Sequence, residues 1–396
     1  MTYATYGDFE ARPAAAWGAV LSMTLCVALL IAAEFMPVSL LTPMAEGLGA
    51  TEGQTGQAIS ISGLFAVLAS LLITTLAGQL NRKWVMVGLT ALMLASLVLV
   101  ALAPSFTVLM VARAALGICV GGFWALATAV IMRLVPERDV PRALSLMFGG
   151  QAMAAAFAAP LGSYLGGMLG WREVFWLLTP LVAANLVWHV IALPSLPARG
   201  RQSLGALTGL LSRPYFRRGL LAAMLSWGSA FTMFTYLRPF LEQVTGVDVT
   251  VLSVLLLVLG LAGFIGTWAA GRIKGAHVAR LLMLPALVMG GVTLALLLVG
   301  GSVLATGALL VVWGAMNTAM SVIWMSWMAQ NAGDAAEAAG SLMVAAIQIA
   351  ILLGAVVGGL LLDGLSISAT FLGSGALAAA AILLIGNGQR LLRPAR

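Results

Sequence analysis

The chain has 396 residues, of which 62% are hydrophobic and only 8% are charged. Soluble globular domains carry about 25% charged residues, so this composition excludes a single water-soluble core and indicates a membrane protein. The formal net charge of +7 would suit a nucleic-acid partner, but the basic residues are distributed as in a membrane protein, and we expect no nucleic acid to bind.

Apolar stretches long enough to cross a bilayer recur along the whole chain. A spanning helix needs about 20 apolar residues, and none of the stretches shows the ten-residue alternation typical of a barrel strand. We therefore predict an all-α membrane protein with twelve transmembrane helices. These cover residues 17–44, 57–78, 85–103, 107–133, 143–165, 174–193, 220–240, 251–271, 281–300, 303–328, 338–362 and 369–392.

The first span contains the run "IAAEFMPVSLLTPM", with one carboxylate, Glu34, and Pro37 three residues later. A charged side chain at the bilayer centre costs about 2.5–3.5 kcal/mol, so such residues are usually functional. Burial disfavours the charged form, and we predict that Glu34 takes up and releases protons. The alternative is a protonated or paired glutamate that only joins two helices. The span is too long for a cleaved signal peptide and should stay in the mature chain.

Two prolines inside spans are candidate hinges, Pro37 in the first and Pro160 in the fifth. Proline lacks the main-chain N–H and bends the helix that carries it. We interpret both as hinges for closure at the outer side, and simple kinked packing is the alternative.

Arg113 lies in the fourth span at a depth close to that of Glu34. A cation beside a carboxylate favours its charged form, so we predict that Arg113 faces Glu34 and modulates its proton binding. The alternative is a structural arginine that binds main-chain carbonyl groups.

The polar segment "PSLPARGRQSLGALTGLLSRPYFRRG" separates six spans from six. We predict an N-terminal half over 1–193, a cytoplasmic linker over 194–218 and a C-terminal half over 219–396. Aligning Pro37 with Pro239 places Glu34 opposite Tyr236. Parallel repeats of this kind hold a substrate between them and support alternating access. We predict a gating or substrate role for Arg238, with an arginine that reaches to water as the alternative.

The basic residues give the orientation. If both termini are cytoplasmic, the inside segments hold 17 of the 20 basic residues, as the positive-inside rule expects. We therefore predict a multi-pass protein of the inner or cytoplasmic membrane. The inside residues are Arg12, Arg82, Lys83, Arg133, Arg138, Arg142, Arg199, Arg201, Arg213, Arg217, Arg218, Arg272, Lys274, Arg280, Arg390, Arg393 and Arg396.

Uncharged polar and aromatic side chains within the spans are the candidate substrate contacts. Aromatic rings stack on flat bases, and amide side chains pair with purine edges. We expect substrate contacts from Trp124, Gln151, Asn317 and Gln348, together with Tyr236. The same residues would suit a flat drug or a sugar.

The loop "GQLNRKW", the Arg113–Gly117 pair of span four and the fifth-span stretch "GGQAMAAAFAAPLGSYLGGMLGWR" together resemble the major facilitator superfamily. The resemblance covers essentially the whole chain and implies a gating role for Arg82. The usual aspartate of that loop is Asn81 here, which leaves the charge relay of the loop without its acid.

Three further stretches, "EFMPVSLLTPMAEGLG", "GGFWALATAVIMRLVPER" and "FTYLRPFLEQVTG", resemble the drug, sugar and nucleoside efflux branch, and within it bacterial purine ribonucleoside efflux pumps. The resemblance implies proton-coupled antiport that exports a small neutral solute, with purine ribonucleosides such as inosine and guanosine as the best match. A multidrug or arabinose-like sugar exporter of the same fold is the alternative.

Other chemistry is not expected from this sequence. It has no GxxxxGK[ST] phosphate loop and no paired-histidine metal spacing, so we predict no cofactor, no metal and no enzyme activity. Cys26 and Cys119 lie inside spans and are interpreted as packing residues. The expected partners are protons, the small solute and the lipid bilayer. We expect a monomer, and a membrane sensor or lipid-handling protein is the rival of another class.

Overall fold

A computed structural model describes residues 15–197, 204–270, 272, 281–332 and 335–393. Six of the basic residues that predict the orientation lie outside this part of the chain, namely Arg12, Arg199, Arg201, Lys274, Arg280 and Arg396. Within the described ranges the chain forms helices and no strand.

The N-terminal half consists of α1 (Trp17–Ser39), α2 (Leu41–Leu48), α3 (Glu52–Ala77), α4 (Arg82–Leu102), α5 (Phe106–Leu134), η1 (Glu137–Asp139), α6 (Val140–Leu169) and α7 (Trp171–Ala192). The predicted linker contains a short helix, α8 (Leu204–Leu211). The C-terminal half consists of α9 (Pro214–Phe234), α10 (Leu237–Phe240), η2 (Leu241–Thr245), α11 (Val249–Ala270), α13 (Met283–Val299), α14 (Val303–Asn331), α15 (Ala336–Gly364), α16 (Ile367–Ile385) and η5 (Gln389–Leu391).

Among the described residues, ten or eleven of the twelve predicted spans are helices long and apolar enough to cross a membrane. Ten of the described helices are long and apolar enough to cross a membrane. An eleventh span is the bent pair of α9 with α10 and η2, whose axes meet at 47°. The twelfth segment corresponds to α13, a shorter apolar helix of 17 residues. The predicted all-α membrane fold is therefore confirmed, and the bounds of its two halves stay predictions.

The first predicted span is not one continuous helix. It divides at Leu40 into α1 and α2, three residues after Pro37. The seventh span divides in the same way between Phe234 and Leu237, close to Pro239. Pro160, by contrast, lies inside α6, which runs without a break. The two corresponding prolines of the halves thus stand next to helix breaks.

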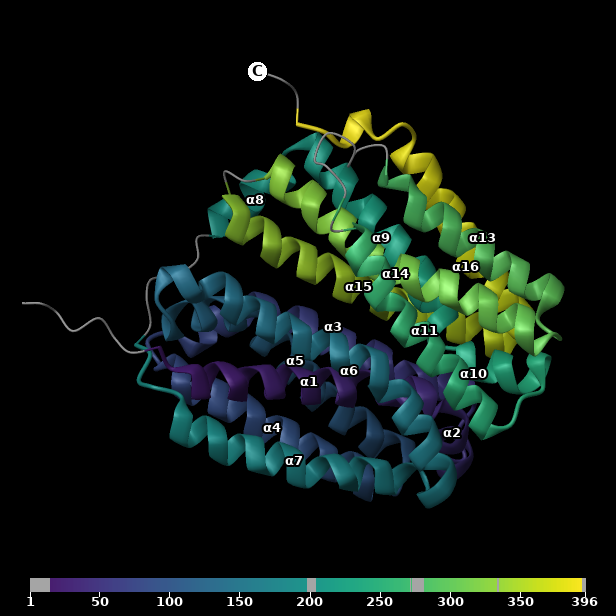
Figure 1. Cartoon of the computed structure of the whole chain (residues 1–396), viewed down its shortest axis with the longest axis horizontal. Helices are drawn as coiled ribbons and strands as arrows, with labels where there is room; N and C mark the ends of the chain where they lie inside the picture. The colour runs from purple at the N-terminus through teal and green to yellow at the C-terminus, as the bar shows by residue number, and fades with distance from the viewer. Residues whose placement is uncertain (1–14, 198–203, 271, 273–280, 333–334, 394–396) are drawn as a thin grey trace, which may run out of the picture.

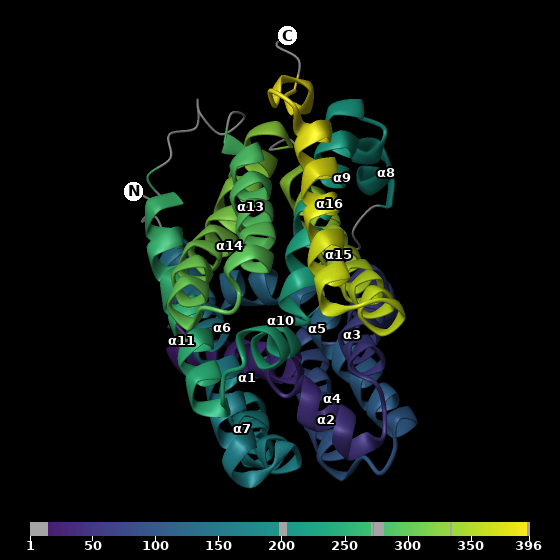
Figure 2. The ribbon, with the colours of Figure 1, turned by 90° about the vertical axis from the view of Figure 1, so that its right-hand side faces the viewer.

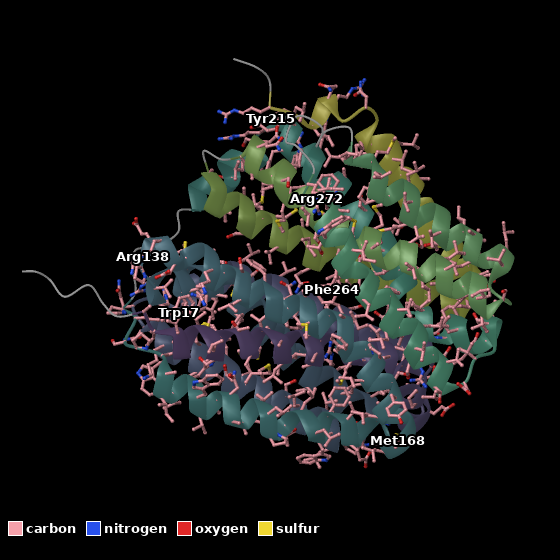
Figure 3. All side chains as sticks on the ribbon, viewed as in Figure 1. Trp17, Arg138, Met168, Tyr215, Phe264 and Arg272 are labelled. Carbon is pink, nitrogen blue, oxygen red and sulfur yellow. The ribbon has the colours of Figure 1, made fainter. Side chains whose placement is uncertain are left out.

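The two halves form two bundles that meet at one end of the molecule. In Figure 1 their ribbons lie close together around α2 and α10 and diverge toward α8. Figure 2, which looks onto the α10 end, shows α10 between the two bundles. Figure 3 places Arg138 and Trp17 toward the α8 end, Met168 at the α10 end and Phe264 between the halves.

Two helix pairs join the halves along their length. The helix α3 packs against α15, and α6 packs against α11. At the second crossing, a Cβ atom on Gly260 would collide with the main chain of Ala156. Only glycine allows the two backbones to approach this closely, which is the means by which helices associate in lipid.

Candidate functional site

The main-chain carbonyl group of Ala33 has lost its usual helix donor, because the residue four positions on is Pro37. Arg113 of α5 supplies a replacement, and its Nη1 donates to that carbonyl oxygen at 2.8 Å. Its Nη2 donates to the Glu34 carbonyl oxygen at 3.0 Å, and its Nε donates to that of Ala58 at 3.0 Å. Arg113 thereby ties α1 and α3 to α5 at the level of the acid.

Arg113 lies beside Glu34, as the sequence predicts, and its charge is close enough to act on the carboxyl group. Its three hydrogen bonds nevertheless go to carbonyl oxygens of the main chain, which is the alternative that the sequence also allows. The arginine is 0% exposed. It holds the backbone around Glu34 in place while its charge acts on the side chain through space.

The carboxyl group of Glu34 lies where the two halves meet. The residue is 5% exposed, and the side chain of Gln348 of α15, in the other half, lies close to its carboxyl group. Gln348 is predicted from the sequence to contact substrate, and the structure places it beside Glu34. A change in the protonation of Glu34 would therefore alter its interactions with residues of both halves.

A cavity lies between α1, α6, α9, α11 and α14. It encloses about 760 Å³ of space not filled by atoms, including space open to solvent. One wall is aromatic, with Phe35 stacked on Phe231 at 5.9 Å and Phe234 stacked on Trp313 at 5.7 Å. The facing wall on α6 is made of alanines, namely Ala152, Ala155, Ala156 and Ala159.

The polar side chains of this cavity are few and uncharged. Among the described residues that line it, the polar ones are Thr267, Asn317, Thr318 and the indole of Trp313. Both threonine hydroxyl groups donate to the carbonyl oxygen of Gly263, at 3.0 and 2.6 Å. Asn317 is thus the predicted substrate residue that the structure places in the cavity.

The remaining predicted substrate residues lie elsewhere. Trp124 stacks on Phe148 at 6.1 Å, within the N-terminal half. Gln151 precedes the alanine wall on α6 but does not line the cavity. Tyr236 is buried, and its hydroxyl group donates to the carbonyl oxygen of Ala355 at 2.7 Å. The roles that the sequence suggests for these three side chains stay predictions.

Arg238 links the two halves at the α10 end. It is 6% exposed, so its guanidinium does not reach out to water. Its Nε pairs with Glu242 at 2.7 Å, and its Nη1 donates to the carbonyl oxygen of Ser39 in the other half. An interaction of this kind must break if the halves separate here, which is the property that a gating residue needs.

Thr42 joins a carboxyl group from each half at the same end. Its Oγ1 lies 3.0 Å from Glu52 and 2.6 Å from Glu242. Gln243 donates to the other oxygen of Glu52 at 3.0 Å. These side chains lie next to Arg238 and form a second set of bonds between α2, α3 and η2.

Asp363, at the end of α15, makes a third link between the halves. It accepts a hydrogen bond from the main-chain N–H of Gly53 at 3.0 Å and another from the hydroxyl group of Thr51. These donors lie at the first turn of α3, where main-chain N–H groups have no partner inside the helix. The bonds of Arg238, Thr42, Gln243 and Asp363 are called the closing contacts below.

The loop before α4 is held within the N-terminal half. Asn81 caps α4 by accepting from the N–H of Lys83 at 3.0 Å, and it also accepts from Leu196 and donates to Ser195. Arg82 is largely buried and donates to the carbonyl oxygen of Leu80 at 3.3 Å. Asn81 thus ties the loop to the start of the predicted linker, and the gating role of Arg82 stays a prediction.

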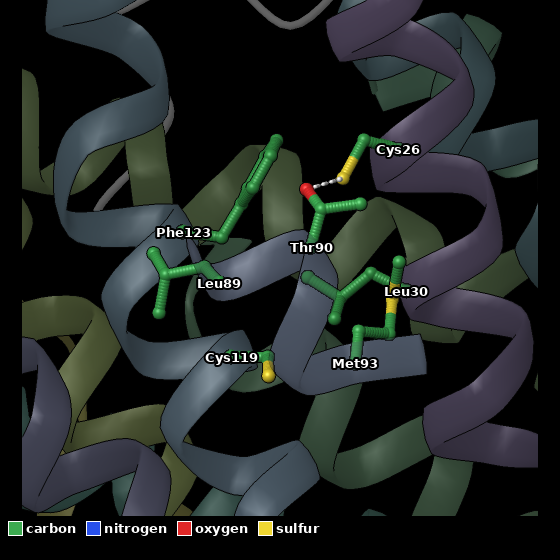
Figure 4. A pocket seen from close by; sticks show the side chains of 7 residues that line it. All are labelled: Cys26, Leu30, Leu89, Thr90, Met93, Cys119 and Phe123. Carbon is green, nitrogen blue, oxygen red and sulfur yellow. Dashed lines mark hydrogen bonds between the residues drawn. The ribbon is translucent and has the colours of Figure 1, made fainter. Parts of the chain in front are cut away.

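A smaller space of about 150 Å³ lies inside the N-terminal half (Figure 4). It is lined mainly by apolar side chains, with Cys26 and Thr90 in contact at 3.6 Å. Cys26 and Cys119 are both free and buried. The interpretation of the two cysteines as packing residues is confirmed by this environment.

Sequence reasoning missed most of the aromatic wall and most of the closing contacts. The sequence does contain one indication of this wall. Trp313 and Asn317 are four residues apart in a predicted span, so they lie on one face of the same helix. Glu52 and Glu242 lie at span ends, where acids are usually solvated, so nothing in the sequence pairs them with Thr42.

Known proteins are similar to this chain in both sequence and fold. The family model of the Major Facilitator Superfamily matches residues 23–345. A Pseudomonas aeruginosa protein named "Transcription regulatory protein OpdE" is 46% identical over 365 residues, 91% of each chain. A Salmonella paratyphi C protein named "Purine ribonucleoside efflux pump NepI" is 38% identical over 384 residues, 97% of this chain and 96% of the relative.

The solved structures of a bacterial homologue of the human lysosomal transporter Spinster have the same fold. The inward-facing, occupied form superposes with a TM-score of 0.76 at 16% identity and covers 95% of this chain and 98% of that one. The inward-facing, unoccupied form gives a TM-score of 0.72 at 17% identity and covers 96% of this chain and 95% of that one. At this level of identity the likeness concerns the fold alone.

Proposed function

The chain belongs to the major facilitator superfamily, and from this premise we propose that it exports a small neutral solute in exchange for protons. The coarse activity, transport of a small molecule across a membrane, follows from the family. Efflux is supported by the relative named a purine ribonucleoside efflux pump. Purine ribonucleosides such as inosine and guanosine are the proposed substrates.

The observation that carries the proton coupling is the position of Glu34. Glu34 is buried, Arg113 binds its main-chain carbonyl oxygen, and Gln348 of the opposite half lies close to its carboxyl group. In the proposed cycle Glu34 is ionised while substrate is held from the inside. A proton from outside then binds Glu34 as substrate leaves, and it crosses with the empty carrier. One proton provides about 2.3 kcal/mol per 100 mV of membrane potential.

The cavity supports a neutral, flat substrate. None of the described residues that line it carries a charge, and an ion that enters an apolar site without a partner loses much solvation energy. A cationic drug would meet no carboxylate on these walls. The aromatic wall offers faces on which a base could stack.

The orientation is part of the proposal. The α8 end is assigned to the cytoplasm because basic residues collect there, with Arg138 labelled in Figure 3. The closing contacts then lie at the outer side, and the structure represents a state closed to the outside. The positive-inside rule supports this assignment.

The test is transport by the purified protein in proteoliposomes. We expect wild type to concentrate radiolabelled inosine against its gradient when a pH difference is imposed. Glu34→Gln, which removes the proton site, should exchange inosine between the two sides but accumulate none. Glu46→Gln, at an exposed acid of α2, is the matched control and should behave as wild type. Accumulation by Glu34→Gln that follows the pH difference would show that the proton site is elsewhere.

A second candidate function has one observation in its favour. The relative at 46% identity is named a transcription regulatory protein, which fits a membrane sensor that transports nothing. The proteoliposome transport assay also distinguishes between these two functions. Purified wild-type protein that moves no nucleoside, sugar or drug under any imposed gradient would favour the sensor.

A further inference from the structure

The indole N–H of Trp313 is a buried donor without an acceptor. Trp313 lies on α14, is 1% exposed and lines the cavity between the halves. Its Nε1 has no hydrogen-bond partner among the described residues. A buried polar group left unpaired is unfavourable, and a ligand in the cavity could supply the missing acceptor.

Asn317 stands one helical turn further along α14 and lines the same cavity. Residues four apart on a helix lie on one face, so the amide and the indole are neighbours. An amide carries two N–H donors and one carbonyl acceptor, whereas an indole can only donate. Thr267 and Thr318 already donate to Gly263. Trp313 and Asn317 are therefore the side chains of α14 that can offer N–H donors at this cavity. The Nε1 atom of Trp313 is enclosed by protein, so the indole must turn for its N–H to meet a ligand.

The surroundings of these two side chains suit a planar ring. Phe234 stacks on Trp313 with 10° between the ring planes, and Phe35 and Phe231 extend the aromatic wall. The alanines of α6 leave room opposite. A heterocycle can lie between the two walls while its polar edge faces α14.

We propose that Trp313 and Asn317 form the specificity element of this cavity and bind the two adjacent acceptors of a 6-oxopurine. This rests on the proposed function for the substrate class. A 6-oxopurine presents O6 and N7 as neighbouring acceptors, whereas adenine presents N7 as an acceptor and its amino group as a donor. Two donors on α14 match the first pattern directly. Adenine requires Asn317 to turn its carbonyl oxygen toward the ligand.

The experiment is equilibrium binding of radiolabelled inosine to the purified protein in nanodiscs, with competition by 7-deazainosine and adenosine. On wild type, 7-deazainosine, which lacks the N7 acceptor, should compete roughly tenfold less well than inosine, as expected for one lost hydrogen bond. Trp313→Phe keeps the ring and removes the donor. It should bind inosine roughly tenfold more weakly and should no longer distinguish inosine from 7-deazainosine.

The matched control is Trp324→Phe. Trp324 lies on the same helix, is also buried and also has an unpartnered Nε1, but it does not line this cavity. We expect this variant to bind inosine as wild type does. Asn317→Leu should reduce the preference for inosine over adenosine, because the remaining indole donor serves N7 of either base.

Each outcome bears on a defined part of the proposal. Equal competition by inosine and 7-deazainosine on wild type overturns the specificity element without any variant. A Trp313→Phe protein that still distinguishes the two ligands overturns the role of the indole. Wild type that binds no nucleoside overturns the substrate class together with this inference. Binding with the expected preference but no pH-driven transport leaves the inference intact and contradicts only the proton coupling.

Discussion

Pro37 of α1 and Pro239 of α10 stand at corresponding places in the two halves, but their surroundings differ. At Pro37, the freed carbonyl group of Ala33 binds Arg113 of the same half. Next to Pro239, Arg238 instead binds the carbonyl oxygen of Ser39 across the interface. The carbonyl group that Pro37 leaves free is therefore bonded inside its own bundle, whereas Arg238 at the second break bonds across the interface to Ser39, the last residue of α1.

Glu34 and Tyr236, which the repeat places opposite each other, also have different partners. Glu34 lies close to Gln348 of the other half. Its counterpart Tyr236 donates to Ala355 within its own half at 2.7 Å, and its hydroxyl group also lies 3.5 Å from the carbonyl oxygen of Gly53 in the other half. The N-terminal break thus carries the buried carboxyl group of Glu34 at the interface, and the C-terminal break carries Arg238, one of the closing contacts. Two similar bends serve different steps of the proposed cycle.

The largest effect is expected when Arg113 is replaced, and it concerns the stability of the fold. Arg113→Leu removes the donor to three carbonyl groups and leaves that of Ala33 without any donor. We expect the free energy of unfolding to fall by about 3 kcal/mol, as for lost bonds to a charged group. Chemical unfolding in detergent micelles measures the loss. If the freed carbonyl of Ala33 is the reason for the arginine, Pro37→Ala should make the substitution less harmful, because position 37 regains an N–H.

A double-mutant cycle of these two positions sharpens the comparison between the breaks. The destabilisation by Arg113→Leu should be smaller by about 1 kcal/mol in the Pro37→Ala background, the net value of one hydrogen bond. A coupling energy of this size is usual for two positions that act on the same group, here the carbonyl group of Ala33. Strict additivity would mean that Arg113 does not compensate for the proline.

An intermediate effect is expected from Arg238, at the other break. Arg238→Gln removes the ion pair with Glu242 and weakens the bond to Ser39, so the α10 end should open more often. Spin labels at the exposed positions Glu46 and Thr250, one in each half, report this in pulsed EPR distance measurements. We expect a longer distance to gain population at the expense of the wild-type one.

The control for Arg238 is an arginine at the same end that bonds within its own half. Arg172 donates to the carbonyl oxygen of Ala103 at 2.9 Å and stacks over Trp171. Arg172→Gln should leave the label distances unchanged. Equal opening by both variants would mean that loss of a charge, rather than loss of the link between the halves, is the cause.

The sequence predicts the helices and the buried charges better than it predicts their partners. Membrane spans can be predicted because a helix that crosses lipid needs a long apolar run. Glu34 and Arg113 can be recognised because charged residues are rare in such runs. The partners depend on packing between distant segments, as with Thr42 and Glu242, which are 200 residues apart. For the same reason the sequence does not reveal that Gln348 lies beside Glu34 or that the first predicted span divides at Leu40, and the substrate role of Gln348 stays a prediction.

The smallest effect on closure is expected from Asp363. Its carboxylate binds the first turn of α3 from the opposite half, where a negative charge is favoured by the helix dipole. Asp363→Asn keeps an oxygen for the N–H of Gly53 but loses the charge, so the labelled α10 end should open less than in Arg238→Gln. Interactions of exposed charges are screened by salt, and Asp363 is exposed. The difference between wild type and Asp363→Asn should therefore shrink as ionic strength rises, whereas the effect of the buried Arg238 should persist. An Asp363→Asn effect that is independent of salt would show that its geometry, and not its charge, closes the α10 end.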